Sequence, residues 1–252
     1  MATTTVPAPE AQATISPFGR IIGVFFSPKA TFEDIVRKPA WVAPMLLLIV
    51  ISIGLSITLV RRADWVEVSK EQIAKSKFAS RQIDQLSEGQ KQAAYEQAAA
   101  RSKVVRYVRG FIGWPCLLLF SSGLYFGAFK LIGGVRTNYA TAFALTTFAH
   151  LPMGVRELIA IPVMFLKDPA SIDPENFLAS NPAAILGSDL ATWQMVPLAF
   201  LDIFGLWALV LMAVAFSVSD PKKLPLGKSL GIAFGVFFSL MLFFTTLAWV
   251  FS

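Results

Sequence analysis

Five long apolar stretches stand out in the pattern of hydrophobic and polar positions along the chain. A helix rises 1.5 Å per residue, so about 20 apolar residues cross the hydrocarbon core of a bilayer, which is roughly 30 Å thick. The stretches that come close to this length or exceed it are residues 41–60, 111–129, 139–166, 193–218 and 229–251. The pattern therefore predicts an all-α fold, a polytopic membrane helical bundle with five transmembrane helices.

The third stretch, residues 139–166, is too long and too polar for one straight span. It contains His150, Pro152, Arg156 and Glu157. A continuous helix of this length would reach about 42 Å. We expect it to kink, to tilt or to leave the membrane near Arg156.

Residues 61–109, between the first two spans, form the one sizeable polar region. Eleven Lys and Arg against six Asp and Glu give it a net charge of +5, most of the +6 of the whole chain. The region has no Pro and favours helix, and Ser87 with Gln90 fits a capping box. We predict a polar helical hairpin that is broken near residues 86–89. It is either a solvated, salt-bridged hairpin or a surface for anionic lipid headgroups, and nucleic acid is not expected.

The residues before the first span divide into two parts. Residues 1–17 are rich in Ala, Thr and Pro, and we expect them to form a disordered tail. Residues 18–40 are amphipathic, with a helix start at Ser27 and Pro28 and a stop at Pro39. This helix either lies in the membrane interface or packs against the bundle, and the pattern favours neither alternative.

Residues 167–194, between the third and fourth spans, form an acidic loop that contains three prolines. Its carboxylates are spread too widely for a calcium-binding loop or for a paired acid and base. We therefore expect a surface loop without a ligand. The acidic residues are Asp168, Asp173, Glu175 and Asp189.

The composition narrows the class of protein further. The chain of 252 residues is 55% hydrophobic and only 15% charged, whereas soluble domains are about a quarter charged. This nearly excludes a soluble enzyme. One cysteine, Cys116, and one histidine, His150, leave no disulfide framework and no zinc site built on several imidazoles or thiolates. We expect no enzymatic activity, no cofactor and no metal.

Four ionisable residues lie within the predicted spans: His150, Arg156, Glu157 and Asp202. Charge inside a membrane is costly, so it is usually paired or functional. Counted along ideal helices, Arg156 lies near the far interface of the third span and Asp202 lies about 12 Å below the same face of the membrane, so Arg156 can reach down towards Asp202. We expect a buried structural pair. The alternative is a relay of His150, Arg156 and Asp202 in a small permease or channel.

Small residues recur at four-residue spacing in two of the spans. Gly123 and Gly127 lie in the second span, and Gly231 and Gly235 in the fifth. Such spacing lets helix backbones approach closely. We interpret these glycines as packing positions within the bundle, with a homo-oligomer as the alternative.

Several segments resemble the bacterial branch of the Yip family of Ypt/Rab-interacting membrane proteins. They are FFSPKATFEDIVRKPAW before the first span, the loop ENFLASNPAAIL, and LDIFGLWALVLMAVAFSV followed by DPKKLPLGKSLGI. The resemblance implies a five-span helical domain in the cytoplasmic membrane of a bacterium, with the N-terminus cytoplasmic and the C-terminus outside. Charge alone does not orient the chain, because each side carries nine Lys and Arg near the span ends.

The resemblance also implies a class of function. It favours a non-enzymatic scaffold or adaptor in membrane organisation or trafficking, whose partners are the lipid bilayer and an unidentified protein. It assigns no biochemical activity to particular residues. The permease or channel built on His150, Arg156 and Asp202 remains the alternative.

Overall fold

The computed structural model describes residues 15–186 and 190–251, and all regular secondary structure in these ranges is helical. The long apolar helices are α3 (Val42–Arg62), α6 (Glu88–Leu131), α7 (Tyr139–Ala149) with α8 (Leu151–Leu166), and α12 (Leu226–Phe251). A fifth span forms if α10 (Thr192–Phe200) and α11 (Ile203–Ser219), bent by 49°, count as one. The prediction of a membrane helical bundle is confirmed. Residues 1–14 of the expected tail, and Asp189, lie outside the described residues.

The N-terminal region forms a hairpin of α1 (Pro17–Phe26) and α2 (Pro28–Arg37). Each helix has Pro at its first position, where the missing N–H costs nothing. Helix α2 packs against α11 and α7 and completely buries Phe32 and Ile35. Of the two alternatives for this segment, packing against the bundle therefore holds for α2, whereas α1 leaves Phe18 and Phe26 exposed.

The polar region contains α4 (Trp65–Lys75), α5 (Lys77–Asp84) and the first half of α6. Asp64 and Ser76 cap the first two helices. The chain then breaks before Glu88, where the Ser87 N–H donates to Oε1 of Gln90 at 3.0 Å. Helix α6 continues from there without interruption for 44 residues. The second hairpin helix and the second span are therefore one helix, because only Pro115 interrupts the helix-favouring sequence and α6 accommodates it.

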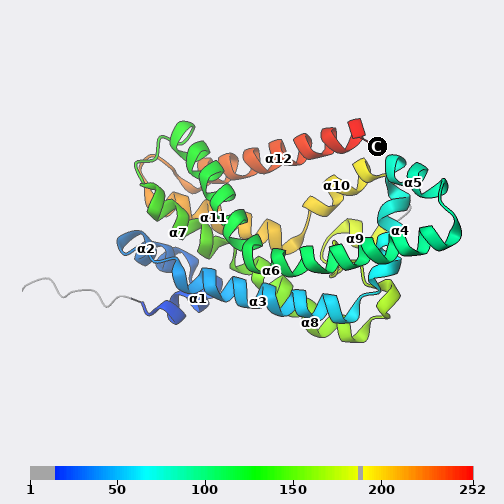
Figure 1. Cartoon of the computed structure of the whole chain (residues 1–252). Helices are drawn as coiled ribbons and strands as arrows, with labels where there is room; N and C mark the ends of the chain where they lie inside the picture. Colours follow the sequence, from blue (N-terminus) through cyan, green and yellow to red (C-terminus); the bar gives the residue numbers. More distant parts are fainter. Residues whose placement is uncertain (1–14, 187–189, 252) are drawn as a thin grey trace, which may run out of the picture.

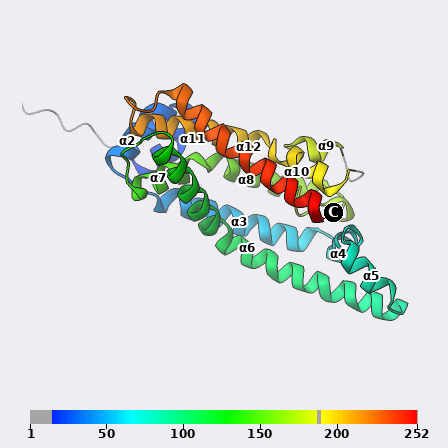
Figure 2. The same cartoon turned by 90° about the horizontal axis from the view of Figure 1, so that it is seen from above.

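The helices form an elongated bundle with distinct ends. Figure 1 places α1 and α2 at one end, and α4, α5 and the C-terminal end of α12 at the other. Figure 2 shows α6 running beside α3 and then past its end towards α5. The main core lies around α2, α7 and α11, where the rings of Phe129 and Phe216 stack at 4.1 Å. A smaller apolar cluster around Leu59, Trp65 and Phe177 lies beneath the polar helices.

Two of the predicted spans are interrupted, each at a capping residue. The third has the kink among the expected alternatives, and it lies at His150, between α7 and α8, because Pro152 stands in the first turn of α8. The fourth breaks at Leu201 and Asp202, between α10 and α11, because the Asp202 carboxylate caps α11. The loop between these spans contains a 3₁₀ turn, η1 (Pro169–Ser171), and the short helix α9 (Pro182–Leu186).

The glycines that bring helices together are not the ones that the spacing indicates. A Cβ at Gly110 would lie 2.6 Å from Ser56 Oγ, and one at Gly154 would lie 2.6 Å from Leu48 Cδ2, so α6 and α8 both approach α3 closely. By contrast, a Cβ would meet nothing within 4 Å, among the atoms that the structure describes, at Gly123, Gly127, Gly231 and Gly235. Packing within the described chain does not account for these four, because their faces of α6 and α12 point away from other helices.

Candidate functional site

Two buried charges from different helices meet inside the bundle. Arg156 lies on α8, and Asp202 precedes the first turn of α11. The Nε atom of Arg156 lies 3.0 Å from Oδ2 of Asp202, and the two side chains are 12% and 9% exposed. The structure therefore brings together the two charges that the depth argument pairs.

Each carboxylate oxygen of Asp202 has its own set of donors. Oδ1 accepts hydrogen bonds from the backbone N–H groups of Phe204 and Gly205, at 2.9 and 3.2 Å. These bonds cap α11 at its N-terminus, where a negative charge is also favoured by the helix dipole. Oδ2 accepts a hydrogen bond from the hydroxyl of Ser180 and forms the ion pair with Arg156. The charge of Asp202 is thus fully engaged within the protein.

Ser180 connects the pair to the acidic loop. Its hydroxyl oxygen accepts a hydrogen bond from Arg156 Nε at 3.0 Å while the hydroxyl donates to Asp202. Its carbonyl accepts from the N–H of Ile203 at 3.0 Å. Phe177, three residues earlier, places its ring 4.4 Å from the guanidinium carbon of Arg156, in a cation–π contact.

The loop over residues 167–194 therefore differs from the expected surface loop. Ile172, Phe177, Ser180 and Asn181 are all buried. The loop folds back over the charge pair, because Phe177 and Ile172 join the smaller apolar cluster. The signal in the sequence was the mixture of apolar residues with Ser and Asn in ENFLASNP, which is unusual for a solvated acidic loop.

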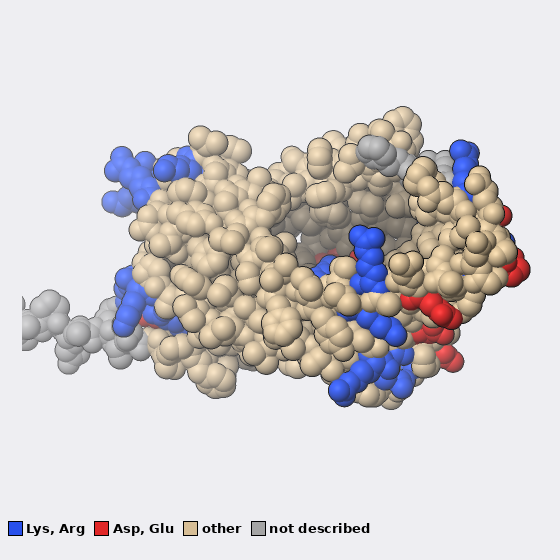
Figure 3. Space-filling model, viewed as in Figure 1, with Lys and Arg blue, Asp and Glu red and all other residues tan. Residues whose placement is uncertain are grey.

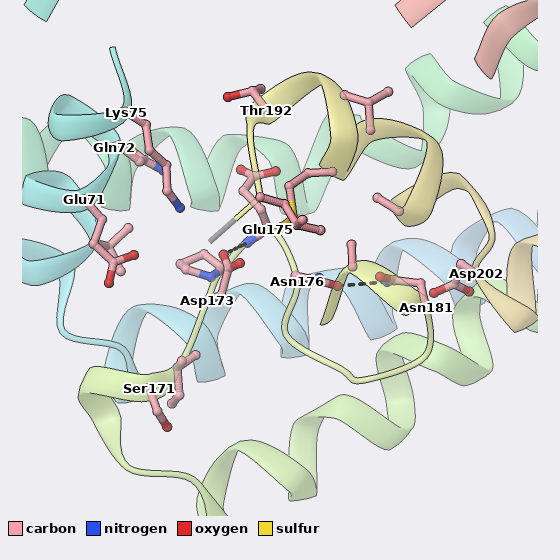
Figure 4. A pocket seen from close by; sticks show the side chains of 18 of the residues that line it. Glu71, Gln72, Lys75, Ser171, Asp173, Glu175, Asn176, Asn181, Thr192 and Asp202 are labelled. Carbon is pink, nitrogen blue, oxygen red and sulfur yellow. Dashed lines mark hydrogen bonds between the residues drawn. The ribbon is translucent and has the colours of Figure 1, made fainter. Parts of the chain in front are cut away.

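A cavity of about 830 Å³ lies beside the pair, between α4, this loop and α10, and both Arg156 and Asp202 line it. Figure 4 shows Glu71, Gln72 and Lys75 of α4 on one side and Asp202 at the far end. Asp173 and Glu175 lie between them. The wall from α10 is apolar and includes Met195 and Val196. The cavity thus joins an ion-paired inner end to an apolar side, a combination that suits an amphipathic guest.

Figure 3 shows how charge is distributed on one face of the molecule. Lys and Arg gather at both ends, and a broad belt with few charges lies between them, as a bilayer requires. Acidic side chains on this face lie mostly at the end with α4 and α5, close to a hollow with Lys and Arg at its edge. In the described ranges, no three His, Cys, Asp or Glu side chains group closely enough to hold a metal ion.

The other two predicted residues lie apart from the charge pair. The His150 Nδ1 atom is 2.8 Å from the carbonyl oxygen of Thr146, so Nδ1 carries the proton and donates it. The His150 ring also contacts the ring of Trp114, with centroids 6.3 Å apart. Glu157 accepts from the indole N–H of the same Trp114 at 3.4 Å. Trp114 of α6 therefore links to both residues, and the structure does not join His150 to Arg156 and Asp202.

Comparison with known proteins yields one match. Residues 22–250 match the family model described as the Yip1 domain, which is nearly the whole chain. No curated protein and no solved structure matches the chain.

Proposed function

The chain belongs to the family of Yip1-domain membrane proteins, and from this premise we propose that it is a non-enzymatic scaffold or adaptor in membrane organisation or trafficking. Its multi-pass helical domain anchors it, and its polar helices bind a protein partner. We place it in the bacterial branch of the family, in a cytoplasmic membrane.

One structural feature carries this proposal, the continuous helix α6. Its 44 residues would measure about 66 Å, roughly twice the hydrocarbon thickness of a bilayer. The half that leaves the apolar region packs against α4, so a polar head formed by residues 65–110 is attached rigidly to the membrane domain. At the far end of this head Phe78 is 74% exposed, an unusual position for a large apolar side chain on a polar surface. A rigid, exposed head of this kind suits docking better than it suits catalysis.

Photo-crosslinking in the native membrane tests the docking role. We expect a photoreactive amino acid at Phe78 or Gln92, both exposed on the head, to give adducts of one recurring protein identified by mass spectrometry. The matched control is Phe243, which is 59% exposed on the apolar helix α12 and should react with lipid. Adducts of lipid alone from both head positions would contradict the adaptor role.

We also propose that the N-terminus is cytoplasmic and that the polar head and the C-terminus lie across the membrane. In a variant in which serine replaces Cys116, single cysteines are introduced at Lys29, Lys222 and Gln85, all exposed. Position 85 should react with an impermeant maleimide in intact cells, and the other two only after permeabilisation. Reaction of position 85 from the cytoplasmic side alone would reverse the orientation.

One observation favours a second candidate function, a small permease or channel. Arg156 and Asp202 line a cavity large enough for a small solute, and its charged inner end reaches into the bundle. His150 would act in such a path only after a rearrangement, since it contacts Thr146 and Trp114 instead. Flux measured in reconstituted vesicles, with the variants of this pair considered in the Discussion, separates the two functions.

A further inference from the structure

A second cavity, of about 270 Å³, lies between α4, α6 and the acidic loop. Three arginines of α6 line it: Arg101, Arg106 and Arg109. They follow one side of the helix over little more than two turns. Trp65 and Gln72 of α4 form the opposite wall. Such a concentration of guanidinium groups in one cavity is suited to an anion, above all to a phosphate or a carboxylate.

The middle arginine is the buried one of the three. Arg106 is 8% exposed, and its Nε atom is buried without a hydrogen-bond partner among the residues that the structure describes. A buried donor of this kind, and still more a buried charge, is costly unless something accepts from it. An anion in the cavity beside it would remove that cost.

The nearby carboxylates do not replace such an anion. Glu157 and Glu175 attract Arg106 electrostatically, yet neither accepts a hydrogen bond from its Nε. Glu157 instead accepts from Trp114. Glu175 approaches Arg109 at 3.7 Å, and both side chains are more than half exposed, so that pair is weak. The cavity keeps a net positive charge.

Its position along α6 indicates where the anion comes from. The apolar stretch of α6 begins at Phe111, so Arg109 lies about 3 Å and Arg106 about 7.5 Å beyond the edge of the hydrocarbon core. The headgroup layer is about 5 to 7 Å thick on each side. Just inside that edge, α6 exposes two apolar side chains to its surroundings, Phe111 and Ile112. A phosphate in the cavity and acyl chains against these residues form one amphipathic ligand.

We propose that this cavity binds the phosphate group of an anionic phospholipid, with Arg106 as the buried donor and Arg101 and Arg109 at the mouth. Guanidinium groups recognise phosphate through charge-assisted hydrogen bonds, which are stronger than neutral ones. Binding places a counter-charge beside the buried guanidinium group of Arg106 and fixes the polar head against the membrane surface.

Lipid titration of the full-length protein tests this site. The delipidated protein in neutral detergent is titrated with dioctanoyl phosphatidylglycerol, and native mass spectrometry counts the bound lipid. Arg106→Gln should weaken binding about tenfold, the effect of losing one charge-assisted hydrogen bond. The matched control is Lys103→Gln, which removes an equal charge from the exposed surface of the same helix and should change binding less than about twofold.

Two further probes separate the lipid from other anions. Glycerol 3-phosphate should compete only weakly, because it lacks acyl chains, and dioctanoyl phosphatidylcholine should bind less tightly, because it has no net charge. Equal affinity for glycerol 3-phosphate would assign the cavity to free phosphate esters and overturn the lipid proposal. Equal affinity for phosphatidylcholine would overturn the role of the arginines.

The stability of the empty protein gives an independent check. Removing an unpartnered buried charge should leave the melting temperature of delipidated Arg106→Gln unchanged or raise it. The stabilisation that phosphatidylglycerol confers on the natural protein should be largely lost in the variant. A clear fall in melting temperature without lipid would show that Arg106 serves the packing of α6, and would overturn the proposal.

Discussion

Asp202→Asn should destabilise the protein by about 3 to 5 kcal/mol, the usual cost of removing one partner of a buried ion pair. The substitution removes the charge and keeps the cap. Asn caps helices as well as Asp does, and its amide oxygen can still accept from the N–H groups of Phe204 and Gly205. What is lost is the acceptor for Arg156 and Ser180. Arg156 would then be buried next to an amide N–H₂ group, without a counter-ion.

The free energy of unfolding is measured by SDS titration of the protein in mild detergent, followed by circular dichroism. Asp64→Asn is the matched control, because Asp64 caps α4 with two equivalent bonds at the exposed surface. It should change the unfolding free energy by less than about 0.5 kcal/mol. An equal loss in both variants would show that capping, and not the ion pair, accounts for the effect of Asp202→Asn.

Removing the other partner of the pair should destabilise the protein less. Arg156→Gln leaves Asp202 with two backbone N–H donors and the Ser180 hydroxyl, so it should cost less than Asp202→Asn. In the double variant no orphaned charge remains, and part of the stability should return. The recovery is incomplete, because the contact of Arg156 with Phe177 is also lost. A coupling energy indistinguishable from zero in this double-mutant cycle would contradict the structural pair.

The same variants separate the two candidate functions. If the pair is structural, loss of function should follow loss of stability, and the double variant should recover both in part. If the pair belongs to a transport path, Asp202→Asn would fold and insert normally but lose flux in reconstituted vesicles. The double variant would not recover that flux. Normal stability combined with lost flux would therefore favour the permease over the adaptor.

The hydrophobic pattern predicts the spans well because the bilayer requires long apolar helices whatever the tertiary contacts. It also predicts the meeting of Arg156 and Asp202, since the helical rise places both below the same membrane face and opposite buried charges within reach stabilise each other. It does not predict Ser180 or Phe177 as their partners. Those contacts depend on how a loop of irregular backbone folds back, which no periodicity encodes.

The breaks and the close contacts between helices show a second limit. The break at Asp202 has a local signal, since Asp is a strong N-cap, but the apolar residues on both sides conceal it. The continuity of α6 has no local signal, because helix propensity does not change where the membrane begins. Four-residue spacing of glycines shows that one face of a helix lacks side chains at those positions. It does not show that a neighbour covers that face, and the approach to α3 uses Gly110 and Gly154 instead.

The second large loss of stability should come from breaking a buried ion pair in the N-terminal hairpin of α1 and α2. Arg20 Nε lies 2.6 Å from Asp34 Oδ2, and the two side chains are 5% and 8% exposed. Arg20 also donates to the carbonyl of Lys38 at 2.9 Å, so it joins α1 to both ends of the last turn of α2. The two residues are 14 positions apart on consecutive helices, and the sequence does not signal the pair.

Asp34→Asn should cost about 3 to 5 kcal/mol, because it leaves Arg20 buried with only backbone acceptors. Asp34 lies on α2, whose residues Phe32 and Ile35 are fully buried in the main core, so the loss should release α2 from the bundle. Thr31, which is 1% exposed, reports this release when it is replaced by cysteine, because its reaction with maleimide should become faster. Glu33→Gln, at the adjacent half-buried position, is the control and should leave the rate unchanged.

The double variant Arg20→Met with Asp34→Leu distinguishes charge from packing. Replacing both partners of a buried pair with apolar residues of similar volume is often neutral or stabilising by about 1 to 4 kcal/mol. We therefore expect the double variant to need at least as much SDS to unfold as the natural protein. The reaction of Thr31→Cys with maleimide should become slow again. If it is as unstable as Asp34→Asn, the directed bonds of Arg20 to Asp34 and Lys38 hold α1 and α2 together, and burial alone does not.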